Sequence, residues 1–212
     1  MATELFFIRH GQSVGNLNHA FLGHTDLPLT QLGKEQAKKA SQYLAGLKPD
    51  VIFASDLKRA YGTALPTAEK TGLPIIKNES LREIFAGEWE NADFDRLPEI
   101  DPKNFTAWLH SFHTARPRGG ESVAELMDRI VHTVTKIAKD NEGKRIFLFT
   151  HATPVRLFAA YCQNKKMEEW NDVPWAPNTS TTHVLYDEGN FTLLDYGRAD
   201  YLEDLVTSFD KE

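Results

Sequence analysis

Short apolar runs separated by longer amphipathic stretches make up most of the 212-residue chain. A short apolar run that stops at polar residues or glycine is typical of a buried strand. Such runs lie at residues 5–8, 51–54, 73–76 and 145–149. Two further runs, 181–186 and 190–196, alternate apolar and polar residues and are joined at Glu188-Gly189. This last pattern predicts a β-hairpin.

The stretches between these runs carry apolar residues at helical spacing. Helices are predicted over residues 29–47, from the capping residue Asp56 to Glu69, over 122–139 and over 154–163. Residues 81–120 depart from this rhythm, because they contain several prolines and only short helical stretches such as 104–112. Strands that alternate with helices predict an α/β fold with helices on both faces of the sheet.

Composition narrows the class of protein. A hydrophobic content of 41% over this length suits one core, so residues 1–212 are expected to form a single domain. The net charge of −6 disfavours nucleic acid or an anionic membrane as a partner. A single cysteine, Cys162, lies among apolar residues and is expected to be a buried, inert thiol. With no membrane-length apolar stretch and no signal-peptide pattern at the N-terminus, we expect a cytoplasmic protein.

Two histidines directly follow predicted strands. His10 comes after the first strand in the unit Arg9-His10-Gly11, and His151 lies between a strand and the start of a helix. Ligands of such sheets bind beyond the carboxyl ends of the strands, and backbone N–H groups at a helix start favour an anion. Imidazole is a competent nucleophile toward phosphorus when a pocket surrounds the phosphoryl group. A chance loop at His10 and a structural histidine at position 151 are the alternatives.

Other residue types suited to phosphate chemistry accompany the histidines. Arg9 offers a planar fork of donors for phosphate oxygens, and Arg59 lies after the second strand in the first turn of a helix. Glu83 is a carboxylic acid able to protonate a leaving oxygen. A surface ion pair is the alternative for Arg59, and both Glu88 and Glu90 compete with Glu83 for the role of the acid.

Taken together and in this order, the motifs resemble the histidine phosphatase superfamily, which includes cofactor-dependent phosphoglycerate mutases and many small phosphatases. The resemblance extends from Phe6 to about Thr182. The matching motifs are Arg9-His10-Gly11 with Asn16, Gly23-x-Thr25-Asp26-x-Pro28-Leu29-Thr30, Ser55-x-Leu57-x-Arg59-Ala60-x-x-Thr63-Ala64, Leu81-x-Glu83-Ile84-x-x-Gly87-x-Trp89-Glu90, Gly120-Glu121-Ser122 and Thr150-His151.

The resemblance implies a fold and a mechanism. The fold would be a phosphoglycerate mutase-like three-layer α/β sandwich, with helices flanking a mostly parallel central sheet. The implied catalytic set is His10, Glu83, His151, Arg9 and Arg59, and the implied substrate-binding set is Arg9, Asn16, Arg59, His151 and Thr25. His10 would be phosphorylated, and Glu83 would act as acid toward the leaving alcohol and then as base toward water. Donors around the phosphorus would stabilise its oxygens, so neither a metal nor a cofactor is expected.

Residues 85–118 form an insertion that is expected to determine the substrate. Its aromatic residues either cover an organic leaving group or pack short helices together, and Arg116 and Arg118 either meet a second anionic group or are solvated. Mutases of this superfamily have a longer insertion with an adjacent arginine pair, which this chain lacks. We therefore expect hydrolysis of a small phosphorylated metabolite. A mutase and a non-catalytic phosphate-binding module remain the alternatives, and a homodimer is possible.

Three positions depart from the pattern of the superfamily. Ala152 follows His151 where glycine is common, which would restrict the backbone beside the pocket. His24 stands where an aromatic residue is common and is expected to line the mouth of the site. Asn91 stands where relatives often have glycine and is expected to lie in a surface turn.

Overall fold

The computed structural model describes residues 1–207, so the last five residues of the predicted 1–212 domain lie outside the described part. The strands are β1 (Thr3–Arg9), β2 (Val51–Ala54), β3 (Ile75–Lys77), β4 (Arg145–Thr150), β5 (Thr181–Asp187) and β6 (Asn190–Arg198). The α-helices are α1 (Val14–Leu17), α2 (Gln31–Gly46), α3 (Lys58–Thr71), α4 (Leu97–Ile100), α5 (Pro102–His110), α6 (Val123–Asp140) and α7 (Ala152–Cys162). The 3₁₀ helices are η1 (Glu79–Leu81), η2 (Gly87–Trp89), η3 (Phe94–Arg96), η4 (Phe112–Thr114), η5 (Met167–Asp172) and η6 (Asp200–Leu205).

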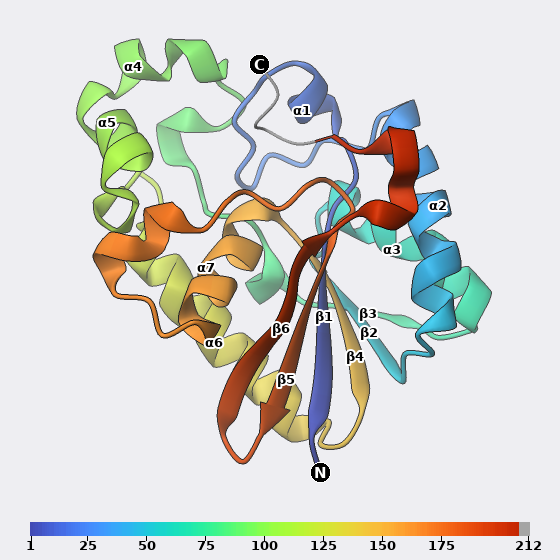
Figure 1. The fold of residues 1–212 in the computed structure, drawn as a ribbon. Helices are drawn as coiled ribbons and strands as arrows, with labels where there is room; N and C mark the ends of the chain where they lie inside the picture. The colour runs from blue at the N-terminus through green and yellow to red at the C-terminus, as the bar shows by residue number, and fades with distance from the viewer. Residues whose placement is uncertain (208–212) are drawn as a thin grey trace.

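The six strands form one sheet in the order β3-β2-β4-β1-β5-β6. The pairs β3/β2, β2/β4 and β4/β1 are parallel, whereas β5 pairs antiparallel with both β1 and β6. Helices α2 and α3 lie on one side of the sheet, and α6 and α7 lie on the other (Figure 1). The predicted three-layer sandwich with a mostly parallel sheet is therefore confirmed, including the hairpin of β5 and β6.

The central strands β1 and β4 contribute to two separate cores, because successive side chains point to opposite faces. In β1, Leu5 and Phe7 join the core under α6 and α7, and Phe6 and Ile8 join the core under α2 and α3. A strand that is apolar on both faces has no solvent-facing side, which explains why residues 5–8 read as an unbroken apolar run.

The start of α3 differs from the sequence prediction. Asp56 does not cap this helix: the N-cap is Leu57, which makes no side-chain capping bond. The carboxylate of Asp56 instead binds the guanidinium of Arg82, and the Lys58 N–H donates to Asp26 Oδ1 at 2.6 Å. A cap supplied from a distant loop thus replaces the local one, and no local pattern could have indicated it.

The insertion between residues 85 and 118 packs into the larger core. Trp108 and Phe112 are buried there, with ring centroids 4.8 Å apart, and Trp89 is fully buried. These aromatic side chains therefore pack short helices together. Asn91 is exposed at φ 59°, in the left-handed conformation of a surface turn, as predicted. Cys162 is buried as expected, and burial raises the pKa of its thiol to about 12.

No helix within residues 1–207 has the length and hydropathy required to cross a membrane. The same residues contain no group of three or more histidine, cysteine, aspartate or glutamate side chains placed to hold a metal ion.

Candidate active site

The carboxyl ends of three parallel strands converge on one edge of the sheet. His10 follows β1, Ser55 follows β2 and His151 follows β4. The His10 N–H donates to the carbonyl of Thr150 at 3.0 Å, which continues the pairing of β1 with β4 by one residue. The rings of His10 and His151 lie 5.2 Å apart between centroids, and both are buried. The structure thus brings together two histidines separated by 141 positions, as the sequence predicted.

A backbone carbonyl fixes the tautomer of His10. Its Nδ1 lies 2.7 Å from the carbonyl oxygen of Gly11, which can only accept a hydrogen bond. Nδ1 therefore carries the proton in the neutral ring, and Nε2 keeps the lone pair. Burial lowers the pKa of His10 well below its usual value, and the charges of Arg59 and Arg9 lower it further. These effects favour the neutral imidazole of His10, with Nε2 available.

Residues from the loop before β5 hold the main chain of His10. Asn178 Nδ2 donates to the His10 carbonyl at 2.9 Å, and the Thr179 N–H donates to the carbonyls of Arg9 and His10 at 3.0 and 3.3 Å. Thr179 adopts φ 60°, which costs a non-glycine residue energy and is tolerated where surrounding contacts dictate it. Thr207 in turn accepts the Asn178 N–H at 2.8 Å. Sequence reasoning missed these residues, because no local pattern marks them.

His151 is fixed by two side-chain contacts. Arg59 Nε donates to His151 Nδ1 at 3.2 Å, and His151 Nε2 lies 2.8 Å from the hydroxyl of Ser55. Since a guanidinium only donates, Nδ1 is the acceptor and Nε2 carries the proton. Burial lowers the pKa of His151 well below its usual value, followed by the charge of Arg59. These contacts and the lowered pKa favour His151 as a neutral donor.

Arg9 and Arg59 bring two buried positive charges to the same place. Arg9 Nη1 donates to the carbonyl of Ala176 at 2.5 Å. Arg59 donates from Nη1 and Nη2 to the carbonyls of Thr25 and Gly23, at 2.8 and 2.7 Å. Burial lowers the pKa of Arg59 to about 10, so the group remains charged at neutral pH. The surface-ion-pair alternative for Arg59 is therefore wrong, since only 1% of its surface is exposed.

Glu83 is a buried carboxyl group held by two backbone donors. Its Oε1 accepts the Ile84 N–H at 2.8 Å, and its Oε2 accepts the Thr153 N–H at 3.2 Å in the first turn of α7. Burial raises the pKa of Glu83, although these donors and the charge of Arg59 oppose the shift. A raised pKa is what a general acid requires near neutral pH.

The two competing glutamates are placed differently. Glu90 accepts the N–H groups of His24, Thr25 and Ala86 at 2.6 to 3.0 Å, and these donors with the Thr25 hydroxyl outweigh burial and lower the pKa of Glu90. Such a carboxylate is a structural anchor and a poor proton donor. Glu88 is exposed and pairs with Arg118 at 3.1 Å. Glu83 is accordingly the best-placed acid of the three.

Asn16 and Thr25, the remaining predicted substrate-binding residues, form hydrogen bonds within the loops around the site. Asn16 Oδ1 accepts the N–H of Ser13 at 3.0 Å, so its side chain helps to cap α1. The Thr25 carbonyl accepts a hydrogen bond from Arg59, and the Thr25 N–H donates to Glu90. Ala152 is the first residue of α7, where any residue adopts the required backbone. The expected restriction at Ala152 is therefore absent.

An ion pair between Arg129 of α6 and Glu121, which precedes this helix, braces the loop of Glu83, and sequence reasoning missed it. All five N–H bonds of Arg129 have partners: the carbonyls of Ser80, Arg82 and Glu83, and both oxygens of Glu121, at 2.7 to 3.1 Å. Glu121 also accepts the N–H of Phe85 at 3.2 Å. These bonds hold the main chain on both sides of Glu83. The signal in the sequence was a charged residue beside Leu126 and Ile130, on the border of the apolar face of α6.

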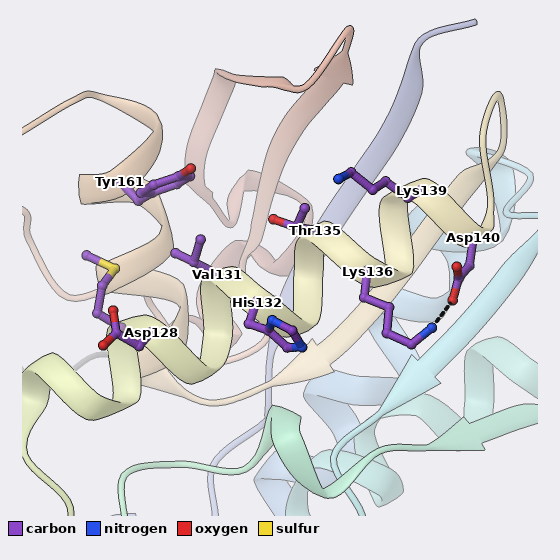
Figure 2. A pocket seen from close by; sticks show the side chains of 9 residues that line it. Asp128, Val131, His132, Thr135, Lys136, Lys139, Asp140 and Tyr161 are labelled. Atoms are coloured by element: carbon purple, nitrogen blue, oxygen red, sulfur yellow. Dashed lines mark hydrogen bonds and ion pairs between the residues drawn. The ribbon is translucent and has the colours of Figure 1, made fainter.

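An open pocket of about 430 Å³ lies next to the loop that carries Glu83. Its walls are His24, Phe85, Gly120, Glu121 and Arg129. The His24 ring donates from Nε2 to the Glu83 carbonyl at 3.1 Å, so His24 contacts the loop of Glu83, and its place at the mouth of the site stays a prediction. A second pocket of about 620 Å³ lies along the outer face of α6 (Figure 2). None of the residues predicted for catalysis or substrate binding lines either pocket.

Comparison with known proteins identifies the family of this chain. A model of the histidine phosphatase superfamily (branch 1) matches residues 5–198. This chain belongs to that superfamily. It is 33% identical over 159 residues to phosphoserine phosphatase 1 of Hydrogenobacter thermophilus, covering 75% of this chain and 74% of the relative.

Two further relatives support this placement. Adenosylcobalamin/alpha-ribazole phosphatase of Escherichia coli is 30% identical over 157 residues, covering 74% of this chain and 77% of the relative. The solved structure of Bacillus stearothermophilus YhfR superposes with a TM-score of 0.91 at 27% identity, covering 95% of this chain and all of that one. The family resemblance of the motifs is thereby confirmed, and the relatives named for an activity are phosphatases.

Proposed function

We propose that this protein is a metal-independent phosphatase that hydrolyses small phosphomonoesters through a phosphohistidine at His10. Buried His10, Arg9, Arg59 and His151 at the same edge of the sheet support binding of one phosphoryl group. The observation that carries the proposal is the tautomer of His10, because the bond from Nδ1 to the Gly11 carbonyl leaves Nε2 as the nucleophile. The phosphatases among the relatives support the same class of reaction.

In the first step, His10 Nε2 attacks phosphorus as the bond to the ester oxygen breaks. Glu83 gives its proton to that oxygen, and the alcohol leaves. Arg9 and Arg59 stabilise the charge on the equatorial oxygens, to which His151 adds a neutral donor. Arg59 uses three of its five N–H groups on the carbonyls of Gly23 and Thr25 and on His151, which leaves two for phosphoryl oxygens.

In the second step, ionised Glu83 takes a proton from water, and the water oxygen attacks phosphorus as the bond to Nε2 breaks. Inorganic phosphate leaves, and both residues return to their starting protonation states. The same carboxyl group serves in both directions because burial raises its pKa, which makes its acid form more accessible at neutral pH.

The test is phosphate release from a panel of metabolite phosphomonoesters and p-nitrophenyl phosphate, in the presence of a chelator, by the wild type and His10→Ala. We expect chelator-resistant release that falls at least a thousandfold in the variant, with an acid-labile phosphoryl label on the wild type only. Residual activity of His10→Ala within tenfold of the wild type would contradict the nucleophile.

The same panel separates the alternative functions. It includes 3-phosphoglycerate with and without 2,3-bisphosphoglycerate, and conversion to 2-phosphoglycerate is measured alongside phosphate release. Isomerisation without release would make the protein a mutase. No turnover of any ester, with phosphate binding retained, would indicate a binding module.

A further inference from the structure

The peptide group between Gly11 and Gln12 lies next to the His10 ring. Its carbonyl oxygen accepts the hydrogen bond from His10 Nδ1 at 2.7 Å, and its N–H donates to Gln36 Oε1 at 2.8 Å. A trans peptide group is planar, with its C=O and N–H directed to opposite sides. The direction of the Gln12 N–H therefore sets the direction of the carbonyl that fixes the tautomer of His10.

Helix α2 approaches this peptide group closely. A Cβ at Gly33 would lie 2.1 Å from the Gln12 carbonyl oxygen, and a Cβ at Gly11 would lie 2.6 Å from the Gly33 carbonyl oxygen. The two glycines therefore permit the contact between α2 and residues 10–12. Because glycine restrains its own backbone less than other residues do, the orientation of the peptide group after Gly11 depends on outside contacts. Gln36, one turn after Gly33 on α2, supplies such a contact.

The side chain of Gln36 is fully buried, and residues near the C-terminus hold its amide. Its Nε2 donates to the Leu205 carbonyl at 2.7 Å and to Thr207 Oγ1 at 2.9 Å. Leu205 is the last residue of η6, which lies beside α2 (Figure 1). Because the Leu205 carbonyl can only accept a hydrogen bond, the amide nitrogen must face it, and the amide oxygen is directed to Gln12.

Thr207 also reaches the other side of His10. Its Oγ1 donates to Asn178 Oδ1 at 3.1 Å, and its carbonyl accepts the Asn178 N–H at 2.8 Å. Asn178 Nδ2 in turn donates to the His10 carbonyl at 2.9 Å. The hydrogen bonds therefore form a closed circuit that begins at Gln12 and returns to His10, and this circuit holds the backbone on both sides of the intervening glycine.

We propose that Gln36 is a positioning residue for the nucleophile: it holds the Gln12 N–H, directs the Gly11 carbonyl to His10 Nδ1 and so keeps the lone pair on Nε2. If the peptide group rotated, the proton on Nδ1 would lose its acceptor. The tautomer protonated on Nε2, which has no lone pair there for phosphorus, would then compete. The inference rests on the proposed function, in which His10 is the nucleophile, and Gln36 acts on it only through the backbone.

The same carbonyl also affects the rate of attack. The His10 ring gains positive charge as the bond from Nε2 to phosphorus forms, and the Gly11 carbonyl oxygen accepts the hydrogen bond from the other ring nitrogen. An acceptor held in this position stabilises the transition state more than the ground state. Loss of Gln36 should therefore lower the rate of phosphoryl transfer and leave phosphate binding intact.

Gln36→Met tests the role, because methionine has a similar length and lacks the amide. We expect kcat/KM to fall at least tenfold on both p-nitrophenyl phosphate and glycerol 3-phosphate, since the nucleophile attacks in each. The inhibition constant of inorganic phosphate should stay within twofold, because the side chains of Arg9, Arg59 and His151 keep their own partners. In ¹⁵N spectra of histidine-labelled protein, with His10 assigned from His10→Ala, the share of the ring protonated on Nε2 should rise.

Two variants at Thr207 repeat the test outside the buried helix. Thr207→Val keeps the shape of the side chain and loses the hydroxyl that bonds Gln36 and Asn178, so kcat/KM should fall at least threefold. Thr207→Ser keeps the hydroxyl and should stay within twofold of the wild type. Gln31→Met is the matched control, because Gln31 lies at the exposed start of α2 and bonds Glu35, and it should change neither kcat/KM nor the His10 tautomer.

The outcomes separate this role from a general loss of structure. An unchanged His10 tautomer in Gln36→Met, or a loss of phosphate binding as large as the loss of kcat/KM, would overturn the positioning role. If Gln36→Met does not fold, the contrast at Thr207 decides, and equal effects of valine and serine would overturn the proposal. Phosphate release by the wild type without an acid-labile phosphoryl label on His10 would instead count against the proposed function itself.

Discussion

Replacing Glu83 by glutamine tests the assignment of the acid most directly. Glutamine keeps the size of the side chain and one carbonyl oxygen, so it can still accept one of the two N–H bonds from Ile84 and Thr153. The other N–H then faces an amide, at a cost of about 1–3 kcal/mol. Removal of a charge that burial disfavours offsets part of this cost. We expect the variant to fold, with a Tm within a few degrees of the wild type.

The effect on the reaction depends on the leaving group. General acid catalysis typically contributes about 10²–10⁴-fold, and an alkoxide needs that proton whereas p-nitrophenolate does not. For Glu83→Gln, kcat/KM should therefore fall at least a hundredfold on glycerol 3-phosphate and less than tenfold on p-nitrophenyl phosphate. We specify kcat/KM because it reports the steps up to departure of the leaving group.

The second step gives an independent signature. Without a base, water attacks the phosphohistidine slowly, so the variant should release p-nitrophenol in a burst of about one equivalent per enzyme, followed by slow turnover. Rapid-quench measurements on both esters provide the data, with Glu88→Gln as the control, since Glu88 is an exposed glutamate of the same loop. Equal losses of kcat/KM on both esters without a burst would refute the role of Glu83.

Two further outcomes follow from the same geometry. Arg129→Gln should lower kcat/KM at least tenfold on glycerol 3-phosphate and less on p-nitrophenyl phosphate, because the hydrogen bonds of Arg129 act through the position of Glu83. The control is Lys136→Gln, which breaks the exposed ion pair with Asp140 on the same helix (Figure 2) and should change kcat/KM on neither ester. An equal loss of kcat/KM on both esters would mean that Arg129 has only a structural role. As pH rises, kcat/KM on glycerol 3-phosphate should fall as Glu83, with its raised pKa, loses the proton it must donate. His10, with its lowered pKa, should add no rise in activity between pH 6 and 7; a pH profile that persists unchanged in Glu83→Gln would contradict this account.

The convergence of the two histidines could be predicted from the sequence because it depends on strand direction. Two buried strands that are parallel end at the same edge, so side chains directly after them are neighbours however far apart they lie in the chain. The apolar runs before His10 and His151 carried this information. The motif resemblance predicted Arg59 and Glu83 as site residues. The structure shows that both are buried, which local spacing could not reveal.

The contacts that orient these residues were beyond the sequence, since they come from loops whose positions depend on the completed fold. Asn178 and Thr179 hold the His10 carbonyl from the loop before β5, and the φ of Thr179 is imposed by its surroundings. Asp56 failed as a predicted cap for the same reason: Arg82 offers its carboxylate a charged partner, and Asp26 serves the helix start instead. Tertiary contacts override local propensity where a polar group has two possible partners.

The titratable groups of the site share one electrostatic feature. Burial shifts the pKa values of His10, His151 and Glu83 toward their neutral forms, whereas Arg59 remains charged at neutral pH. In the proposed reaction the phosphoryl group supplies the missing negative charge, which favours the protonated form of Glu83 just when that proton is needed. Departure of the alcohol leaves Glu83 ionised beside a phosphohistidine, which is the state that activates water. The same burial therefore serves both steps, because the substrate changes the charge of the site while the protein holds the groups in place.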